Sequence, residues 1–332
     1  MSPDHRRSEP VASGPCPVFI FSLPRTGSTL LQRVLGAHSE ISTVSEPWIL
    51  LPLLYARRDT GIYAEYDHGL ARGAVDDFIA TLPAGGADYD DAVRAFAMRL
   101  YERAARPGAS LFVDKTPRYH VVAEDVMRIF PDAKSVFLWR NPLAAAASLI
   151  NTYADGQWNL YLNKVDLFDG IGHLIDAYRA NQQRAYAMRY EDLVREPEAE
   201  LRKLCDYLGV PWQASMLTDA DRVELGGRLG DRRQAPVSAD GVGSWQATFA
   251  PALRRRWARR YLSWLGRERL ATMGYDLDEL RAELSSTPAT FDGVAVDAAR
   301  MLYGTAWSGL EPVLVRDKVR RLRDWRGIHA HP

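Results

Sequence analysis

The sequence predicts an α/β protein with a central, mostly parallel β-sheet flanked by helices. Short apolar runs rich in β-branched and aromatic residues recur along the chain, and such runs are typical of buried strands. These runs lead through polar loops into apolar residues at helical spacing, which is the order that parallel crossover connections require. With 332 residues, 47% of them hydrophobic, the chain can bury a sizeable core.

Strands are predicted, in chain order, over residues 17–23, 111–113, 133–139 and 187–190. The first strand leads into a helix that places Leu31 and Leu35 on one face. The second and third strands lead into helices that begin near prolines, because proline is compatible with the first turn of a helix. Parallel strands therefore alternate with helices through the first half of the chain.

Longer helices are predicted over 89–106, 197–208 and 251–265. In the first of these, one face is expected to cover the sheet, and it carries Val93, Phe96, Ala97 and Leu100. The second ends at Gly209, which tolerates the left-handed conformation at a helix terminus. The Gly-rich segment 226–243 is a predicted loop. We expect a flexible N-terminus over 1–16, one large domain over 17–280 and a helical C-terminal extension over 281–332.

The charge and cysteine content narrow the function classes. Forty-two basic residues balance forty-two acidic ones, so no overall field favours nucleic acid, and a bound anion must be held locally. The two cysteines, Cys16 and Cys205, lack metal-ligand spacing, which indicates a reducing compartment. The sequence shows neither a signal peptide nor an apolar run of about 18 residues. We therefore expect a cytoplasmic protein without an integral membrane segment.

The loop after the first strand has the residue types of an anion-binding site. Backbone N–H groups in the first turn of a helix converge on one point, where the helix dipole also favours negative charge. Gly27 allows close approach to the backbone, and Arg25 adds a planar, charged donor. A Walker A loop would need glycine at Ser22 and lysine at Ser28, and neither is present. Taken alone, the segment fits a polar turn equally well.

A second anion-binding segment comes after the third strand. Arg140 is predicted at the carboxyl end of that strand, the edge where ligands bind in open α/β sheets. Asn141 can cap the next helix, Pro142 suits its first position, and Ser148 lies farther along it. Alternatively, Arg140 forms a surface ion pair and Ser148 is a small packing residue. The presence of both segments favours the binding interpretation.

Together these segments resemble the nucleotide-binding motifs of sulfotransferases that use 3'-phosphoadenosine 5'-phosphosulfate (PAPS), in particular the tyrosylprotein, heparan sulfate and bacterial branches. Residues 189–212 and 242–245 extend the resemblance, which implies the P-loop-like sulfotransferase fold over 17–280. It implies that the 5'-phosphosulfate contacts Arg25, Thr26, Gly27, Ser28, Thr29 and Leu30, and that the 3'-phosphate contacts Arg140 and Ser148. Second-tier candidates are Arg232 and Arg233, whereas Tyr190 fits a packing role equally well.

The same resemblance implies three catalytic residues. Arg25 and Lys115 would stabilise the transferring group, and Glu46 would act as the general base. The alternatives are structural: Glu46 also fits the first turn of a helix, and Lys115 fits an exposed ion pair with Asp114. His120 is a rival candidate for the base.

The implied reaction is the metal-independent transfer of a sulfuryl group from PAPS to a hydroxyl or amine, releasing 3'-phosphoadenosine 5'-phosphate (PAP). The acceptor is a small molecule, carbohydrate, lipid or peptide. Aromatic residues that could line an acceptor cleft, or equally belong to the core, are Trp48, Tyr55, Tyr63, Tyr66 and Trp158. The missing Walker lysine disfavours a kinase. A non-catalytic nucleotide-binding or assembly protein is the other alternative, because a helix over 312–325 would allow a homo-oligomer.

Overall fold

The computed structural model describes residues 14–59, 62, 64, 66–226 and 243–310 of the chain. These residues contain a parallel five-stranded sheet with the strand order β2-β3-β1-β4-β5. The strands are β1 (Cys16–Phe21), β2 (Ile41–Thr43), β3 (Leu111–Asp114), β4 (Lys134–Trp139) and β5 (Ala185–Arg189). The predicted α/β class with a parallel sheet is therefore confirmed.

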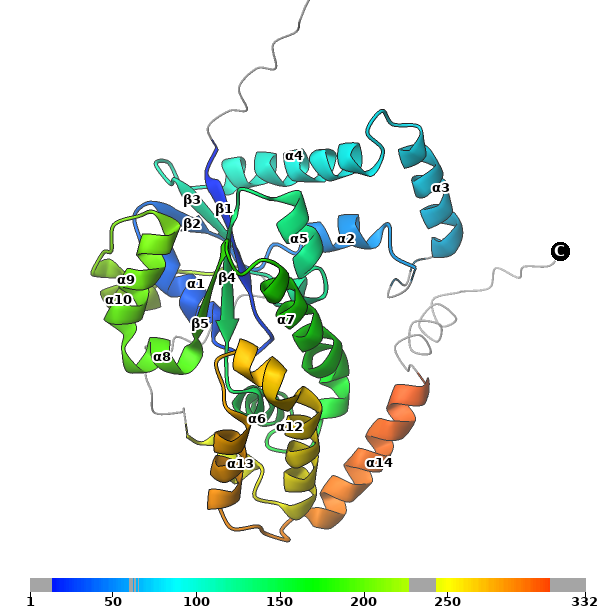
Figure 1. The fold of residues 1–332 in the computed structure, drawn as a ribbon, viewed down its shortest axis with the longest axis vertical. Coiled ribbons are helices and arrows are strands. Elements are labelled where there is room, and N and C mark those ends of the chain that lie inside the picture. Colours follow the sequence, from blue (N-terminus) through cyan, green and yellow to red (C-terminus); the bar gives the residue numbers. More distant parts are fainter. Residues whose placement is uncertain (1–13, 60–61, 63, 65, 227–242, 311–332) are drawn as a thin grey trace, which may run out of the picture.

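Helices cover both faces of the sheet (Figure 1). Alternating strand residues point to opposite faces, so Phe19, Phe112 and Phe137 join one hydrophobic cluster, whereas Val18 and Val136 join the other. The aromatic side packs against helices that include α4 (Gly86–Ala104), α5 (Ala123–Ile129), α6 (Pro142–Tyr153) and α7 (Ile171–Ala180). The aliphatic side packs against α1 (Ser28–Gly36), α8 (Tyr190–Arg195), α9 (Pro197–Leu208) and α10 (Ser215–Thr218). Both faces are therefore buried.

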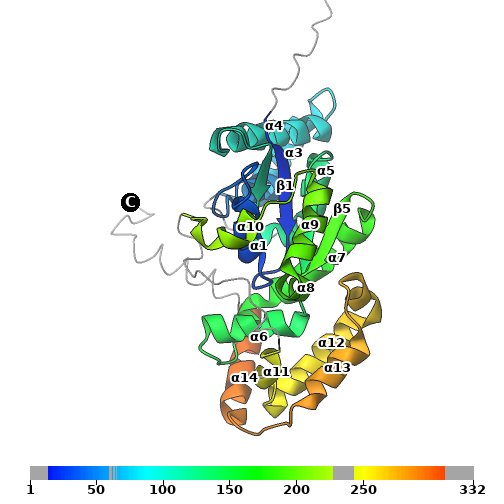
Figure 2. The ribbon, with the colours of Figure 1, turned by 90° about the vertical axis from the view of Figure 1, so that its left-hand side faces the viewer.

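The C-terminal helices lie beyond the carboxyl ends of the strands (Figure 2). They are α11 (Trp245–Thr248), α12 (Ala252–Thr272), α13 (Leu277–Ser286) and α14 (Val294–Leu310). Arg254 of α12 forms a 2.6 Å ion pair with the buried Asp297 of α14, which fixes the last described helix to the body. None of the helices within the described ranges is long and apolar enough to cross a membrane.

Several predicted boundaries are wrong by a few residues. Strand β5 ends at Arg189, and Tyr190 already begins α8. The predicted helix 89–106 is α4, and its covering face is shifted because Tyr101 is buried, whereas Phe96 and Leu100 are 47% and 40% exposed. The predicted helix 251–265 matches the first part of α12, because Gly266 has a non-helical backbone, and a second helical segment then continues to Thr272.

Other elements were not predicted. They include β2, the helices α2 (Leu50–Tyr55) and α3 (His68–Ala80), and the short helical segments η2 (Leu160–Asn163), η3 (Val165–Gly170) and η4 (Ala220–Arg222). The short helical segment η1 (Pro117–Val121) begins at the proline where a helix was expected. The division into 1–16, 17–280 and 281–332 stays a prediction, although β1 begins at Cys16 and α13 runs through position 280. The helix expected over 312–325 lies outside the described residues.

Candidate active site

The loop between β1 and α1 has an unusual backbone. Arg25 and Gly27 both have positive φ angles, 67° and 92°, and the hydroxyl of Thr26 donates a 2.8 Å hydrogen bond to the carbonyl oxygen of Leu23. A non-glycine residue in this region costs roughly 1–3 kcal/mol, so the fold must hold Arg25 there. No side chain caps the amino end of α1. The N–H groups of its first turn are thus placed to receive an anion.

Gly27 is required for a second reason, because the ring of Tyr190 lies against it. A β-carbon at position 27 would lie 2.3 Å from Cδ2 of Tyr190, closer than side-chain carbons approach in folded proteins. The other neighbour of this ring is Arg140, whose guanidinium carbon is 4.5 Å from the ring centroid. Tyr190, for which the sequence favoured neither a packing role nor a nucleotide contact, therefore packs between the two anion-binding segments.

The second segment lies beside the first. Arg140 follows β4 and donates a 2.7 Å hydrogen bond from Nη1 to the carbonyl oxygen of Arg25. The Nε of Arg25 donates in turn to Oγ of Ser148, on α6, at 3.2 Å. As predicted, Asn141 caps α6 by accepting hydrogen bonds from the backbone of Leu143 and Ala144 at 2.9 and 3.3 Å. Residues far apart in the sequence thus form one cluster.

Arg140 retains an unused hydrogen-bond donor. Its Nε is buried and has no partner among the described residues. Burial lowers the pKa of Arg140 from its ordinary value, but a guanidinium remains protonated at neutral pH. A partly buried cation whose buried Nε lacks a partner is suited to a phosphate oxygen.

Glu46 and Lys115 form a largely buried ion pair. Lys115 follows β3, and its Nζ lies 2.6 Å from Oε1 of Glu46 and 3.4 Å from the hydroxyl of Thr29 on α1. The side chains of Lys115 and Glu46 are 2% and 13% exposed. The alternatives for both residues are therefore wrong: Lys115 is not an exposed partner of Asp114, and the helix after Glu46 starts only at Leu50.

Asp114 is a fully buried carboxylate that sequence reasoning did not assign to the site. Its oxygens accept hydrogen bonds from the hydroxyls of Tyr101 at 2.6 Å, Tyr119 at 3.0 Å and Thr116 at 3.1 Å. Burial raises the pKa of Asp114 to about 6, and the hydroxyl donors and Lys115 limit that rise. Its position, as a charged residue ending an apolar strand, is the one signal in the sequence.

His120 lies in a different environment. It is fully buried, and its Nε2 is 2.7 Å from Oδ1 of Asp166, which also pairs with Arg118 at 3.0 Å. A β-carbon on Gly170 would lie 2.3 Å from its Nδ1, so the imidazole is packed against the backbone. Burial lowers the pKa of His120 below its ordinary value. The imidazole of His120 is therefore enclosed within the fold.

Other predicted contributors are absent from the cluster or lie outside the described residues. Trp158 is 4% exposed and packs edge-on against Trp257, so it belongs to the core and not to a cleft. Tyr63, Arg232 and Arg233 are not among the described residues. Within the described ranges, no three His, Cys, Asp or Glu side chains form a group that could hold a metal ion.

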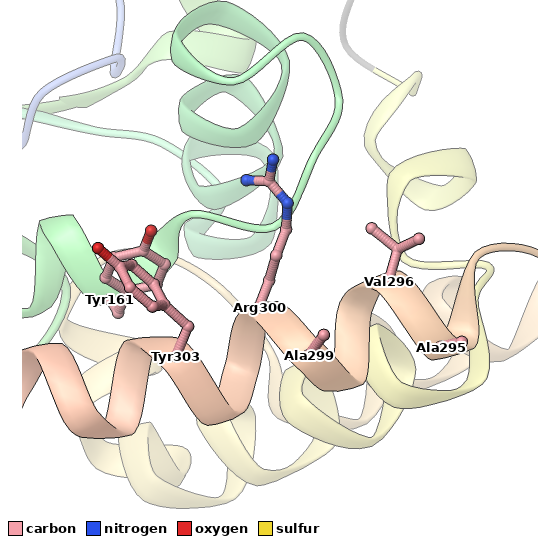
Figure 3. Close-up of a pocket in the computed structure, with 6 residues that line it drawn as sticks. All are labelled: Tyr161, Ala295, Val296, Ala299, Arg300 and Tyr303. Carbon is pink, nitrogen blue, oxygen red and sulfur yellow. The ribbon is translucent and has the colours of Figure 1, made fainter.

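A groove of about 740 Å³ runs along α14, away from the predicted site residues (Figure 3). Its lining is Tyr161 of η2 together with Ala295, Val296, Ala299, Arg300 and Tyr303. A more polar cavity of about 620 Å³ reaches Asn141 and Glu191 from the side of α13. Among these lining residues, Asn141 follows Arg140 directly in the chain, and Glu191 interacts electrostatically with Arg140.

Comparison with known proteins identifies the family. Residues 17–214, more than half of the chain, match the model of the sulfotransferase family. The chain belongs to the sulfotransferase family. The matched residues include every one of the predicted site residues from Arg25 to Ser148.

Two relatives and one solved structure show how similar this sulfotransferase-family chain is to known proteins. The nodulation protein NoeE of Sinorhizobium fredii is 28% identical over 252 residues, covering 68% of this chain and 58% of NoeE. Protein-tyrosine sulfotransferase 1 of Danio rerio is 22% identical over 271 residues, covering 78% of this chain and 72% of the relative. The solved sulfotransferase domain from the curacin biosynthetic pathway has a TM-score of 0.52 and 23% identity, covering 76% of this chain and 97% of that domain.

The structural likeness confirms the predicted P-loop-like sulfotransferase fold. The chain spans little more than half of the length of NoeE, 58%, so the two proteins are matched only over a shared region.

Proposed function

We propose that this chain is a PAPS-dependent sulfotransferase that transfers a sulfuryl group to a hydroxyl or amine acceptor and releases PAP. The observation that carries the proposal is the clustering of three cations, Arg25, Lys115 and Arg140, and one carboxylate, Glu46, around the uncapped amino end of α1. The protein has no net charge. A local concentration of cations in a neutral chain indicates a site for a highly charged anion.

The two anion-binding segments would divide the nucleotide between them. The 5'-phosphosulfate would bind the first-turn N–H groups of Ser28, Thr29 and Leu30, with Arg25, Thr26 and Gly27 completing the loop. The 3'-phosphate would bind Arg140, through its unused Nε, together with Ser148. The bond between Arg25 and Ser148 would then be exchanged for bonds to the nucleotide.

The proposed chemistry is an in-line displacement at sulfur. The acceptor oxygen or nitrogen forms a bond to sulfur as the bond from sulfur to the phosphate oxygen breaks, and the acceptor proton passes to Glu46. Lys115 lies between Glu46 and Thr29, so its ammonium is placed to stabilise the sulfuryl oxygens and the leaving phosphate. Fixed cations thus supply the charge stabilisation, and the proposed mechanism requires no metal.

The acceptor is proposed as a class: a hydroxyl or amine on a small molecule, carbohydrate, lipid or peptide. We also propose a cytoplasmic location, because PAPS is then directly available to the site and the two free cysteines fit a reducing environment.

The proposal is tested by nucleotide binding followed by turnover. PAP should raise the melting temperature, and ATP at the same concentration should raise it much less, because a ligand that binds the folded state more tightly stabilises it more. PAP release from PAPS should then depend on one member of a panel containing 4-nitrophenol, a tyrosine peptide, a glucosamine oligosaccharide and a long-chain alcohol. Stronger stabilisation by ATP than by PAP would contradict the proposal and favour a kinase.

A further inference from the structure

A continuous chain of hydrogen bonds connects the buried Asp114 to the candidate base. Asp114 ends β3 and is fully buried, and its Oδ1 accepts a hydrogen bond from the hydroxyl of Thr116 at 3.1 Å. The hydroxyl oxygen of Thr116 accepts in turn from the backbone N–H of Trp48 at 3.3 Å. The indole Nε1 of Trp48 then donates to Oε2 of Glu46 at 3.1 Å.

The direction of these bonds is set by the chemistry of the groups. An ionised carboxylate only accepts hydrogen bonds, so the single proton of the Thr116 hydroxyl is directed to Asp114. The oxygen of Thr116 is therefore left as an acceptor for Trp48. The other carboxylate oxygen of Asp114 is occupied by the hydroxyls of Tyr101 and Tyr119, which fixes the carboxylate in one orientation.

Trp48 has a backbone conformation that needs such support. Its φ angle is 58°, and a bulky residue in this left-handed region is strained by roughly 1–3 kcal/mol. The bond to Thr116 holds this backbone in place. In this conformation the indole of Trp48 lies against Glu46, two positions earlier in the chain, and donates a hydrogen bond to it. A change in the backbone of Trp48 would therefore move the hydrogen-bond donor of Glu46.

Both oxygens of Glu46 are therefore supported by the consecutive residues 114–116, one directly and the other through Trp48. Oε1 bonds to Lys115, and Oε2 bonds to Trp48, whose backbone is held by Thr116, while Asp114 holds Thr116. A general base requires its lone pair to be directed at the acceptor proton, and a small misplacement of a catalytic group lowers the rate strongly. Removing one of the two supports should leave the carboxylate free to rotate.

We propose that Thr116, anchored by Asp114, is a positioning residue that fixes the carboxylate of Glu46 through Trp48. This inference rests on the proposed function, because it concerns the base of the proposed transfer. It adds a set of residues that do not contact the nucleotide but determine how the base faces the acceptor.

The test replaces the hydroxyl of Thr116 and compares turnover with binding. Thr116→Val keeps the shape of the side chain but removes the hydrogen bonds of its hydroxyl with Asp114 and Trp48. We expect kcat to fall about tenfold, the effect of one net hydrogen bond, with unchanged PAP affinity. Thr116→Ser keeps the hydroxyl and should restore kcat. Trp48→Phe should lower kcat to a similar extent, and the double variant should lose much less than the product of the single losses.

A second measurement is independent of the acceptor. In protein labelled with ¹⁵N at the tryptophan indoles, the resonance of Trp48 is identified by its loss in Trp48→Phe. Thr116→Val should shift that resonance, because its hydrogen bond to Glu46 weakens, whereas Thr116→Ser should leave it in place. An unchanged resonance in Thr116→Val would overturn the inference whichever acceptor is used.

Tyr101→Phe is the matched control. It removes one of the two hydroxyls at Oδ2 of Asp114, but Tyr119 still holds that oxygen and the bonds that join Thr116, Trp48 and Glu46 remain, so stability should fall while kcat and the indole resonance stay the same. Equal loss of kcat in Tyr101→Phe and Thr116→Val would show that the network is only structural and would overturn the inference. If Glu46→Gln lowers kcat but Thr116→Val does not, the inference alone fails. If Glu46→Gln has no effect on kcat, the proposed base itself fails.

Discussion

Glu46 is held by bonds that do not use all of its capacity. Each carboxylate oxygen has two lone pairs, and the contacts with Lys115 and Trp48 use one on each oxygen. The side chain is also slightly exposed, at 13%, whereas Lys115 is enclosed. In the proposed mechanism, these free lone pairs are the ones that would accept the acceptor proton while the ion pair stays in place.

Glu46→Gln should lower kcat by about 10²–10⁴-fold, the range expected for loss of a general base, with PAP affinity nearly unchanged. Glutamine retains an oxygen that accepts from Lys115, so the fold should remain intact. Steady-state kinetics and calorimetric titration with PAP measure the two effects. Glu40→Gln is the control, because Glu40 lies before β2, whereas Glu46 lies after the other end of that strand. If Glu46→Gln had the same kcat as the parent, Glu46 would not be the general base.

Asp114 gives the stability a specific pH dependence. Burial raises its pKa from 3.8 to about 6 in the folded protein, with Lys115, Tyr101 and Tyr119 beside it. A carboxyl whose folded pKa is raised stabilises the fold fully below about pH 4 and loses that contribution as the pH rises through about 6. We therefore compare the unfolding free energies of the parent and of Asp114→Asn. The difference, parent minus variant, should fall by up to about 3 kcal/mol as the pH rises from 4 to 7. Urea unfolding at four pH values measures this difference, which would be constant if Asp114 did not titrate.

At the scale of elements, the site is built from residues at the carboxyl ends of three neighbouring strands. The loop after β1 supplies Arg25, the residue after β3 is Lys115, and the residue after β4 is Arg140. Strands β3, β1 and β4 are adjacent in the sheet and parallel, so their carboxyl ends meet at one edge. The cations are therefore brought together by strand order, and the turn at Gly27 determines how closely Tyr190 and Arg140 approach the loop.

Gly27→Ala should impair both folding and nucleotide binding. The new methyl group would clash with the ring of Tyr190, and the positive φ angle of 92° adds backbone strain of about 1–2 kcal/mol. Gly108→Ala is the matched control, because Gly108 also has a positive φ angle, 83°, but no atom lies within 4 Å of the added carbon. Both variants should lose stability in urea unfolding, but only Gly27→Ala should lose PAP affinity. Equal PAP affinity in the two variants would contradict the packing role of Gly27.

The central strands were predictable because they are buried on both faces, which produces continuous apolar runs. Strand β2 was missed because it is a three-residue edge strand that contains Ser42 and Thr43. The covering face of α4 was misjudged because Phe96 and Leu100 share helical spacing with Val93, yet the tertiary contacts bury Tyr101. Edge position and tertiary packing leave little trace in the local pattern.

At the scale of the whole molecule, the site is made of contacts between distant parts of the chain. The ion pair of Lys115 with Glu46 joins residues 69 positions apart, and the bond of Arg25 to Ser148 joins residues 123 positions apart. The motifs indicated the candidate residues, because each has a distinctive local pattern. Their pairing, the hydrogen bonds of Thr116 to Asp114 and Trp48, and the enclosure of His120 depend on the tertiary fold and could not be predicted from local spacing.

The most direct test of the proposed nucleotide site compares PAP with AMP, which differ only by the 3'-phosphate. Calorimetric titration should show that the parent protein binds PAP more tightly, and that Arg140→Ala reduces this preference about 10- to 100-fold, the effect expected for charged hydrogen bonds. Arg189→Ala, at the end of β5, should keep the preference because Arg189 is paired with Asp192. If Arg140→Ala weakened PAP and AMP equally, the 3'-phosphate would not bind at Arg140, and the assignment of this edge of the sheet to PAPS would be contradicted.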